Sequence, residues 1–270
     1  IERGKMGEHD SKVAIVTGGA QGIGKGIVDI LSSEGATVCV ADISEEFGEK
    51  TTEEIKASGG NALFIKANFE DSNTPKIVVE KCLKNYGKLD ILVNNVGIQP
   101  PTSYKNVEET PEEIWDAIIN VNLKSYFLMS KYSIPYMRKN GGGSIVNISS
   151  VQGLQSQKLV PPYAASKGGV LSLTRQMSLD YISEKIRINA VCPGAFDTPM
   201  VRKSISGDIT DGLKSIGALI PIGRVGQIHE IGQVTSFLCS DKASYISGEY
   251  INVDGGVMAK GGWDSDLQGK

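Results

Sequence analysis

Tyr163 and Lys167 are the two side chains whose types and spacing best suit proton transfer. They lie four residues apart in a segment with helical spacing, which Pro161 and Pro162 can open, so both point to one face of a helix. A free phenol has a pKa of about 10, whereas a nearby cation favours the phenolate and lowers that pKa. The pair is therefore a candidate acid and base for an alcohol or a carbonyl. A solvated helix face without a chemical role would show the same spacing.

Ser150 and Asn122 are further polar side chains that could act with Tyr163. Ser150 follows the apolar run 144–148, and its hydroxyl could bond the same substrate oxygen as Tyr163 or merely stabilise a turn. Asn120 and Asn122 interrupt an apolar helical pattern and, being two residues apart, cannot share one site. A buried Asn needs hydrogen-bond partners, so it either bonds neighbouring backbone or binds water in a cleft.

A glycine-rich turn lies between the first predicted strand and the first predicted helix. Residues 12–17 form a short apolar run typical of a buried strand. The sequence Gly18-x-x-x-Gly22-x-Gly24 then leads into a helical pattern over 25–33. Glycines let the backbone approach a pyrophosphate, and the helix N-terminus offers free N–H groups and partial positive charge. This context favours a dinucleotide site, although a tight turn without a ligand would have the same sequence.

Asp42 indicates which dinucleotide the turn would bind. It ends a second apolar strand, 37–42, 18 residues after Gly24. An acid at this place can accept hydrogen bonds from the adenosine ribose hydroxyls and would repel a 2′-phosphate. The glycine turn itself contains no Lys or Arg, so the sequence predicts NAD rather than NADP. The alternative is that Asp42 caps the helix that begins near Ser44.

Strands and helices alternate along the rest of the chain. The remaining predicted strands are 62–67, 88–93, 144–148, 185–192 and 250–253, and the predicted helices are 45–58, 72–86, 111–138, 163–183 and 228–240. This alternation requires parallel crossovers, which predicts an α/β fold with a doubly wound parallel sheet and helices on both faces. Within the helix 111–138, Pro135 predicts a kink or a break.

Two segments at the carboxyl ends of predicted strands complete the expected site, because such folds bind ligands there. Asn95 follows the strand 88–93 and is expected to brace neighbouring strands, whereas Gly97 allows close approach of the backbone. Residues 196–226 have no clear period and are rich in Gly, Ile and Ser. They are predicted to form a substrate lid with its own helix near 200–215.

Composition and charge limit the possible functions. The 270 residues carry a net charge of −3, which gives no support for binding nucleic acid or a membrane surface. No apolar run approaches the roughly 18–20 residues that span a bilayer. Four widely spaced cysteines and only two histidines predict no metal site, and buried free thiols suit a reducing compartment such as the cytoplasm. We expect an N-terminal arm or expression remnant over 1–11, one domain over 12–256 and a polar tail over 257–270.

Taken together, several motifs resemble the short-chain dehydrogenase/reductase family over about residues 12–256. The matching motifs, in chain order, are Thr17-Gly18-x-x-x-Gly22-x-Gly24, Asn94-Asn95-x-Gly97, Asn122, Ser150, Tyr163-x-x-x-Lys167 and Pro193-Gly194 followed by Thr198. The resemblance implies a NAD(P)-dependent oxidoreductase with a single Rossmann-like domain and a sheet of seven strands. Hydride would move between a carbinol carbon and the nicotinamide, while Tyr163 takes or gives the hydroxyl proton.

The resemblance also implies roles for individual residues. Ser150 would polarise and hold the substrate oxygen, and Lys167 would lower the pKa of Tyr163 and bond the nicotinamide ribose. Asn122 would hold a water in a proton relay to Lys167, and Thr198 would contact the carboxamide or the diphosphate. The expected cofactor contacts are Gly18, Gln21, Gly22, Ile23, Gly24, Asp42, Asn68, Phe69, Asn95, Gly97, Tyr163, Lys167, Pro193, Gly194 and Thr198.

Two positions depart from the usual pattern of the family. Val96 stands where the family has Ala in Asn-Asn-Ala-Gly, which adds two methyl groups beside the cofactor; a small shift would accommodate them. Asn68 stands where the family usually has an Asp that meets the adenine amino group. Its amide oxygen can still accept a hydrogen bond from that group, so we expect a modest weakening at most.

The reaction expected from these residues is the NAD-dependent interconversion of a secondary alcohol and a ketone. Gln152, Gln155, Gln157 and Lys158 suit a hydroxyl-rich substrate such as a sugar or polyol, or they face solvent. The alternative enzymes are a 3-oxoacyl thioester reductase and a hydroxysteroid dehydrogenase. Outside the enzymes, the alternative is a catalytically idle NAD-binding sensor or scaffold. The resemblance further implies a homotetramer or homodimer.

Tyr163→Phe should lower kcat by at least ~10²-fold, because it removes the group that exchanges the proton with the substrate. NAD affinity should stay near the wild-type value, since the ring remains in place. Steady-state kinetics and a fluorescence titration with NAD measure the two quantities. Retained activity would remove Tyr163 from this role.

Overall fold

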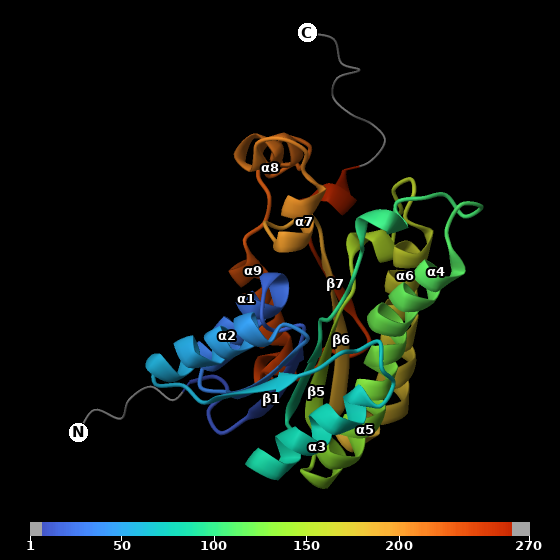
Figure 1. The fold of residues 1–270 in the computed structure, drawn as a ribbon. Helices are drawn as coiled ribbons and strands as arrows, with labels where there is room; N and C mark the ends of the chain where they lie inside the picture. The colour runs from blue at the N-terminus through green and yellow to red at the C-terminus, as the bar shows by residue number, and fades with distance from the viewer. Residues whose placement is uncertain (1–6, 261–270) are drawn as a thin grey trace.

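Seven parallel strands form one sheet in the computed structural model, which describes residues 7–260 (Figure 1). They are β1 (Val13–Thr17), β2 (Thr37–Asp42), β3 (Ala62–Lys66), β4 (Ile91–Asn94), β5 (Gly143–Ile148), β6 (Ile186–Pro193) and β7 (Tyr250–Val253). Across the sheet their order is β3-β2-β1-β4-β5-β6-β7, and all neighbours are parallel. The predicted α/β class and doubly wound sheet are confirmed. The chain reverses direction across the sheet between β1 and β4, where such folds open a ligand crevice.

Helices cover both faces of the sheet. They are α1 (Gly22–Ser33), α2 (Glu45–Ala57), α3 (Thr74–Tyr86), α4 (Glu112–Ile119), α5 (Ser125–Lys139), α6 (Pro161–Tyr181), α7 (Pro199–Ser204), α8 (Ile209–Ala218) and α9 (Ile228–Cys239). Figure 1 shows α1, α2 and α9 on one face and α3, α5 and α6 on the other. Alternate residues of β1 follow this division: Val16 packs in the cluster with α1 and α9, and Ile15 packs in the cluster with α3 and α5. Strands buried on both faces read as continuous apolar runs.

The segment predicted as one helix over 111–138 is continuous but changes its winding. α4 passes into a π-helical turn, Asn120–Lys124, and then into α5. The break considered at Pro135 is not found, because α5 runs through this residue to Lys139. Pro135 is exposed, so water can solvate the carbonyl that loses its helical partner. The π-helical turn was not foreseen, and such turns often lie at functional sites.

The predicted lid over 196–226 contains two short helices, α7 and α8, in place of the one expected near 200–215. Its two ends are held together at the base, where Phe196 pairs with Gly226 as an isolated β-bridge. The Asp197 amide donates to the Gly226 carbonyl at 3.0 Å, and the Gly226 amide donates to the Ala195 carbonyl at 2.9 Å. The lid is therefore a closed loop on a fixed base above the carboxyl ends of the strands (Figure 1).

Part of each terminal segment belongs to the folded structure. Of the expected N-terminal arm, the described residues 7–11 include His9, whose ring is buried and contacts the Ser236 hydroxyl at 2.8 Å. Of the expected tail, Val257–Ala259 form a short 3-10 helix; residues 1–6 and 261–270 lie outside the described part. Within residues 7–260, no helix combines the length and the apolar character needed to cross a membrane.

α1 and α9 touch backbone to backbone through two glycines. A methyl group added to Gly26 would collide with the Ile228 carbonyl, and one added to Gly232 would collide with the Gly26 carbonyl. We therefore expect Gly232→Ala to lower the free energy of unfolding by ~1–3 kcal/mol, the usual effect of overpacking.

Gly168→Ala on α6 is the matched control, because its added methyl would meet its nearest atom, the Gly153 carbonyl oxygen, at an ordinary 3.6 Å. It should leave stability unchanged or raise it slightly, since Ala favours a helix over Gly. Urea unfolding followed by circular dichroism compares the two variants. Equal stability of both would contradict the close packing of α1 on α9.

Candidate active site

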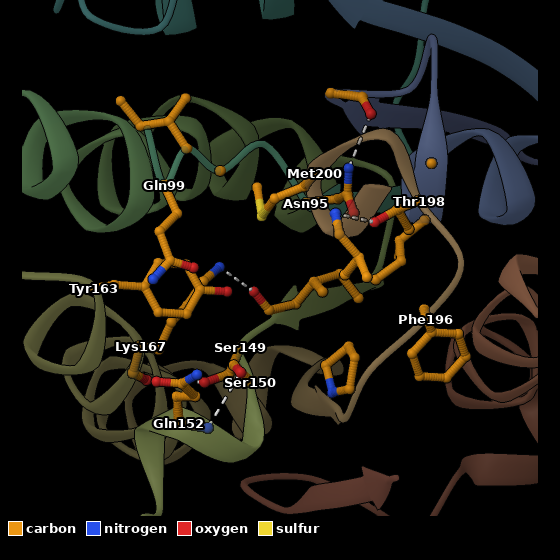
Figure 2. Close-up of a pocket in the computed structure, with 18 of the residues that line it drawn as sticks. Asn95, Gln99, Ser149, Ser150, Gln152, Tyr163, Lys167, Phe196, Thr198 and Met200 are labelled. Carbon is orange, nitrogen blue, oxygen red and sulfur yellow. Dashed lines mark hydrogen bonds between the residues drawn. The ribbon is translucent and has the colours of Figure 1, made fainter. Parts of the chain in front are cut away.

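One cavity of about 810 Å³ collects nearly all the residues expected at the site. It lies at the carboxyl ends of the strands and beneath the lid. Its lining includes every expected catalytic or cofactor-binding residue except Asn122, namely Gly18, Gln21, Gly22, Ile23, Gly24, Asp42, Asn68, Phe69, Asn95, Gly97, Ser150, Tyr163, Lys167, Pro193, Gly194 and Thr198. Tertiary structure thus brings together segments spread over the whole chain (Figure 2).

The glycine turn is held in shape by Asn95. The Asn95 Nδ2 donates to the carbonyls of Thr17 and Gly18, both at 2.9 Å, so the predicted bracing of neighbouring strands is confirmed. Gly18 and Gly22 have φ angles of 63° and 56°, in the left-handed region that favours glycine. A methyl group on Gly24 would collide with the Gly18 carbonyl. All three glycines of the motif are therefore favoured by the turn itself, the first two by their φ angles and the third by close packing.

The N-terminus of α1 fits the pyrophosphate of a dinucleotide. Gln21 precedes this twelve-residue helix and makes no side-chain capping bond, and the first turn contains no acidic residue. The unpaired N–H groups of the first turn and the helix dipole therefore remain available to an anion. Gly22, Ile23 and Gly24, which form this turn, all line the cavity. These residues would hold the diphosphate of a bound NAD(P).

Asp42 organises the backbone at the end of β2 and at the glycine turn. Its Oδ2 accepts from the Ala20 amide at 3.0 Å, and its Oδ1 accepts from the Ser44 amide at 2.9 Å. Ser44, not Asp42, is the N-cap residue of α2. Each carboxylate oxygen accepts more than one hydrogen bond, so both keep capacity for ribose hydroxyls. Among the described residues that line the cavity, Lys167 is the one Lys or Arg.

Lys167 is buried beneath the catalytic region with few charged neighbours. Its side chain is 3% exposed, and its Nζ donates to the Ile148 carbonyl at 2.9 Å and to the Tyr126 hydroxyl at 3.5 Å. The same Nζ lies 5.7 Å from the centre of the Tyr163 ring. Burial lowers the pKa of Lys167 to about 8, because the charged form loses its hydration.

The pKa of Tyr163 differs from the expectation. Burial raises the pKa of Tyr163 to about 12, and a hydrogen bond with the Ser150 side chain acts in the opposite direction. The expected lowering of this pKa by Lys167 is therefore not found in the protein alone, because desolvation of the phenolate is the largest effect on it. Ser150 is placed as expected, with its Oγ also accepting from the Gln152 amide at 3.1 Å.

Asn122 lies behind the cavity and holds the segment that follows β4. Its Oδ1 accepts from the Ile98 amide at 2.8 Å, while its Nδ2 donates to the Ile98 carbonyl at 3.0 Å and to the Ser166 hydroxyl at 3.3 Å. Of the two alternatives for a buried Asn, bonding to backbone is the one observed. The proton relay through a water stays a prediction, and one lone pair of Oδ1 remains for it.

Thr198 and Asn68 both lie at the cavity and have protein partners. The Thr198 hydroxyl accepts from the Val201 amide at 3.3 Å and so caps α7, while its methyl lies 3.6 Å from where a methyl group added to Gly22 would be. The Asn68 Oδ1 accepts from the Glu70 amide at 3.1 Å. Both side chains line the cavity, and their contacts to carboxamide, diphosphate and adenine stay predictions.

Several lining residues were not foreseen from the sequence. Behind the lining, Tyr126 was also not foreseen; it is fully buried and bonds both Lys167 and the Ile148 carbonyl, and its one signal was a polar aromatic in an apolar stretch. The lid contributes an apolar wall of Met200, Val201, Ile216, Leu219 and Ile220. Gln99 was not foreseen either, whereas Gln152, Gln155 and Gln157, which the sequence suggested for the substrate, also line the cavity. The lining of one cavity therefore combines the expected cofactor-binding residues with apolar lid residues and side-chain amides.

Comparison with known proteins agrees with this arrangement. A family model described as "Enoyl-(Acyl carrier protein) reductase" matches residues 18–258. A cyclopentanol dehydrogenase of Comamonas sp. is 39% identical, covering 94% of this chain and all of that protein. A 3-oxoacyl-[acyl-carrier-protein] reductase of Thermotoga maritima is 41% identical, over 92% of this chain and 98% of that protein.

The fold agrees with a solved structure as well. The crystal structure of a levodione reductase superposes with a TM-score of 0.88 at 31% identity, covering 93% of this chain and 99% of that chain. With motifs, fold and relatives in agreement, the chain belongs to the short-chain dehydrogenase/reductase family. It is an oxidoreductase of the kind that uses NAD(P).

The pH dependence of alcohol oxidation should report Tyr163. The phenol must be deprotonated to accept the substrate proton, and its pKa of about 12 in the protein alone keeps it protonated near neutrality. The positive charge of a bound oxidised nicotinamide favours the phenolate. With saturating NAD, kcat/KM for the alcohol should therefore rise about tenfold per pH unit and level off below the ordinary phenol value of about 10.

Lys167→Met should move the part of the rising limb below pH about 8 to higher pH, because there Lys167 is a cation that favours the phenolate. Tyr126→Phe, which removes a neutral hydroxyl from the same buried group, is the matched control and should shift the limb less. A flat pH profile up to about 10 in the wild type would exclude Tyr163 as the titrating base.

Proposed function

We propose that the protein interconverts a secondary alcohol on a compact alicyclic skeleton and the corresponding ketone, with NAD as cofactor. One observation carries the proposal: a single cavity is lined by Asp42, by Tyr163 with Ser150 and Lys167, and by apolar residues of the lid. Each part matches one part of the reactants, namely the adenosine ribose, the reacting carbinol and the carbon skeleton.

The preference for NAD rests on charge. A 2′-phosphate would have to lie beside the Asp42 carboxylate, where like charges repel. The acids Asp42 and Glu70 face this part of the cavity, and the one cation that lines the described cavity, Lys167, is committed to the Ile148 carbonyl near the reacting end. Ribose hydroxyls, in contrast, can donate to the carboxylate.

The chemistry follows from three side chains. In oxidation, Tyr163 as phenolate accepts the hydroxyl proton, and Ser150 donates a hydrogen bond that holds the same oxygen. Lys167 places positive charge beneath the phenol and so favours the phenolate while the proton is transferred. The bound nicotinamide supplies the acceptor for the hydride, so the carbinol loses one hydride and one proton in becoming a ketone.

The substrate skeleton is inferred from the lid. Met200, Ile216, Leu219 and Ile220 present apolar surface to the chamber, which suits a hydrocarbon ring. A cyclohexanol dehydrogenase of Acinetobacter sp., 36% identical over 96% of this chain, supports the same class. The glutamines that suggested a sugar or polyol include Gln155 and Gln157, which are exposed at the mouth of the cavity, so the apolar lid residues favour a ring alcohol over a sugar.

A second candidate is a reductase of 3-oxoacyl thioesters. The 41% identity to the Thermotoga maritima reductase favours it. The acidic, lysine-poor cofactor end speaks against it, because such reductases normally use NADP. An idle NAD-binding sensor would bind NAD without turning over any substrate.

Asp42→Ala tests the cofactor assignment together with the reaction. The wild type should oxidise cyclohexanol and cyclopentanol with NAD at least ~10-fold more efficiently than with NADP. The variant should bind NAD more weakly, because the hydrogen bonds to the ribose are lost. Its catalytic efficiencies with NAD and NADP should lie within a few-fold of each other, because the repulsion of the 2′-phosphate is lost as well. Steady-state kinetics with each cofactor measure the ratio.

Asn68→Ala is the control variant, since it alters the same end of the cavity without changing charge. An unchanged ratio in Asp42→Ala would contradict the ribose assignment. Turnover of 3-oxoacyl thioesters with NADPH, without oxidation of ring alcohols, would favour the second candidate. NAD binding without any turnover would favour the sensor.

The cytoplasmic location and the homotetrameric or homodimeric state expected from the family stay predictions. The four cysteines are buried and free, which is compatible with a reducing compartment.

A further inference from the structure

Two glutamine side chains that line the cavity carry buried polar atoms without a partner. The Gln99 Nε2 and the Gln152 Oε1 have no hydrogen-bond partner among the described residues, and both residues line the cavity. Figure 2 shows them on the side of the view that also holds Tyr163 and Lys167, with Thr198 and Phe196 opposite. One amide thus offers a free N–H donor and the other a free carbonyl acceptor.

Unpaired amides of this kind need an explanation, because a buried polar atom that lacks a partner costs free energy. Within residues 7–260, the other buried unpaired side-chain atoms are those of Asn94, Ser133 and Thr235, none of which lines the cavity. Gln99 and Gln152 differ from these because they adjoin empty space large enough for a ligand. A ligand can therefore provide the missing partners.

The backbone beneath each glutamine is fixed by a residue of the site. Gln99 follows Ile98. The side-chain amide of Asn122 accepts from the Ile98 N–H and donates to the Ile98 carbonyl. The backbone amide of Gln152 donates to the Ser150 Oγ at 3.1 Å. Gln152 lies in a short 3-10 helix, Val151–Gly153, whose N-cap residue is Ser150. The backbone that carries the two glutamines is thus held relative to Ser150 and Asn122, so their side chains reach the cavity from fixed positions of the chain.

We propose that Gln99 and Gln152 form a subsite for a second oxygen of the substrate, so that ring diols are preferred to simple ring alcohols. A hydroxyl oxygen accepts from the Gln99 Nε2, and a hydroxyl proton is donated to the Gln152 Oε1. A hydrocarbon ring with one hydroxyl satisfies neither amide, whereas the apolar lid wall still requires a hydrocarbon skeleton. This inference rests on the proposed function and narrows its substrate class.

The discrimination expected from such a subsite is large. A site built to hydrogen-bond a substrate hydroxyl rejects the analogue that lacks it, because its own polar groups are then left unpaired. With two neutral hydrogen bonds, kcat/KM for the best cyclohexanediol isomer should exceed that for cyclohexanol by about 10- to 100-fold. The isomer with the highest value identifies the ring position that meets the subsite.

The test compares cyclohexanol with the 1,2-, 1,3- and 1,4-cyclohexanediols in the wild type, Gln99→Met and Gln152→Met. Methionine keeps the length of glutamine but has no N–H donor or carbonyl acceptor, so each variant should lower the diol-to-cyclohexanol ratio of kcat/KM by about 5- to 10-fold. Gln155→Met, at the exposed mouth, is the matched control and should leave the ratio unchanged. Melting temperature and NAD affinity check that each variant folds.

The outcomes separate this inference from the proposed function. Oxidation of cyclohexanol and of every diol with equal efficiency would leave the function intact and overturn the subsite. If none of these alcohols is oxidised, the proposed function fails. The subsite is then tested by binding, with calorimetric titration of NAD-saturated protein with the same alcohols. The subsite is supported if the wild type binds a diol at least tenfold more tightly than cyclohexanol and if both methionine variants lose this difference. Equal affinities overturn it.

Discussion

The burial of the Lys167 ammonium is the constraint around which this active site is built. A protonated lysine that is 3% exposed is stable only with close acceptors, and here one is the Ile148 carbonyl at the end of β5. The fall of the pKa of Lys167 from 10.5 to about 8 corresponds to roughly 3 kcal/mol of unfavourable burial at about 1.4 kcal/mol per pKa unit. Because the unfolded chain binds this proton more tightly, the cost is present below pH 8 and disappears as the pH rises toward 10.5.

Several other features keep this lysine in place. Tyr126 bonds the same carbonyl and contacts the ammonium, which links α5 to the end of β5. The Ser149 hydroxyl donates to the Lys167 carbonyl at 2.8 Å and so fixes α6 against the same strand. Gly97 lies where a methyl group would come to 3.5 Å from the Lys167 Nζ and 3.6 Å from the Asn122 Oδ1. The packing of α5, α6 and the segment after β4 thus depends on one buried cation.

The cofactor end is organised by different means, mainly backbone hydrogen bonds. Asn95 holds the Thr17 and Gly18 carbonyls, and Asp42 holds the Ala20 and Ser44 amides. The two side chains therefore fix the glycine turn from opposite sides before any ligand binds. Preorganisation of this kind lowers the entropy lost on binding. It also explains why side chains that were expected to meet the cofactor already have protein partners.

Local features of the sequence determined the strands, the glycine turn and the Tyr163–Lys167 face, because periodicity, glycine conformation and the spacing of four residues on a helix act over short distances. Contacts between distant segments could not be foreseen. Three such features arise from packing: the π-helical turn that contains Asn122, the contact of Lys167 with Tyr126, and the unpaired amides of Gln99 and Gln152. The same reason explains the pKa of Tyr163: the sequence supplied the neighbouring cation, but only the tertiary structure decided how much water the phenol loses.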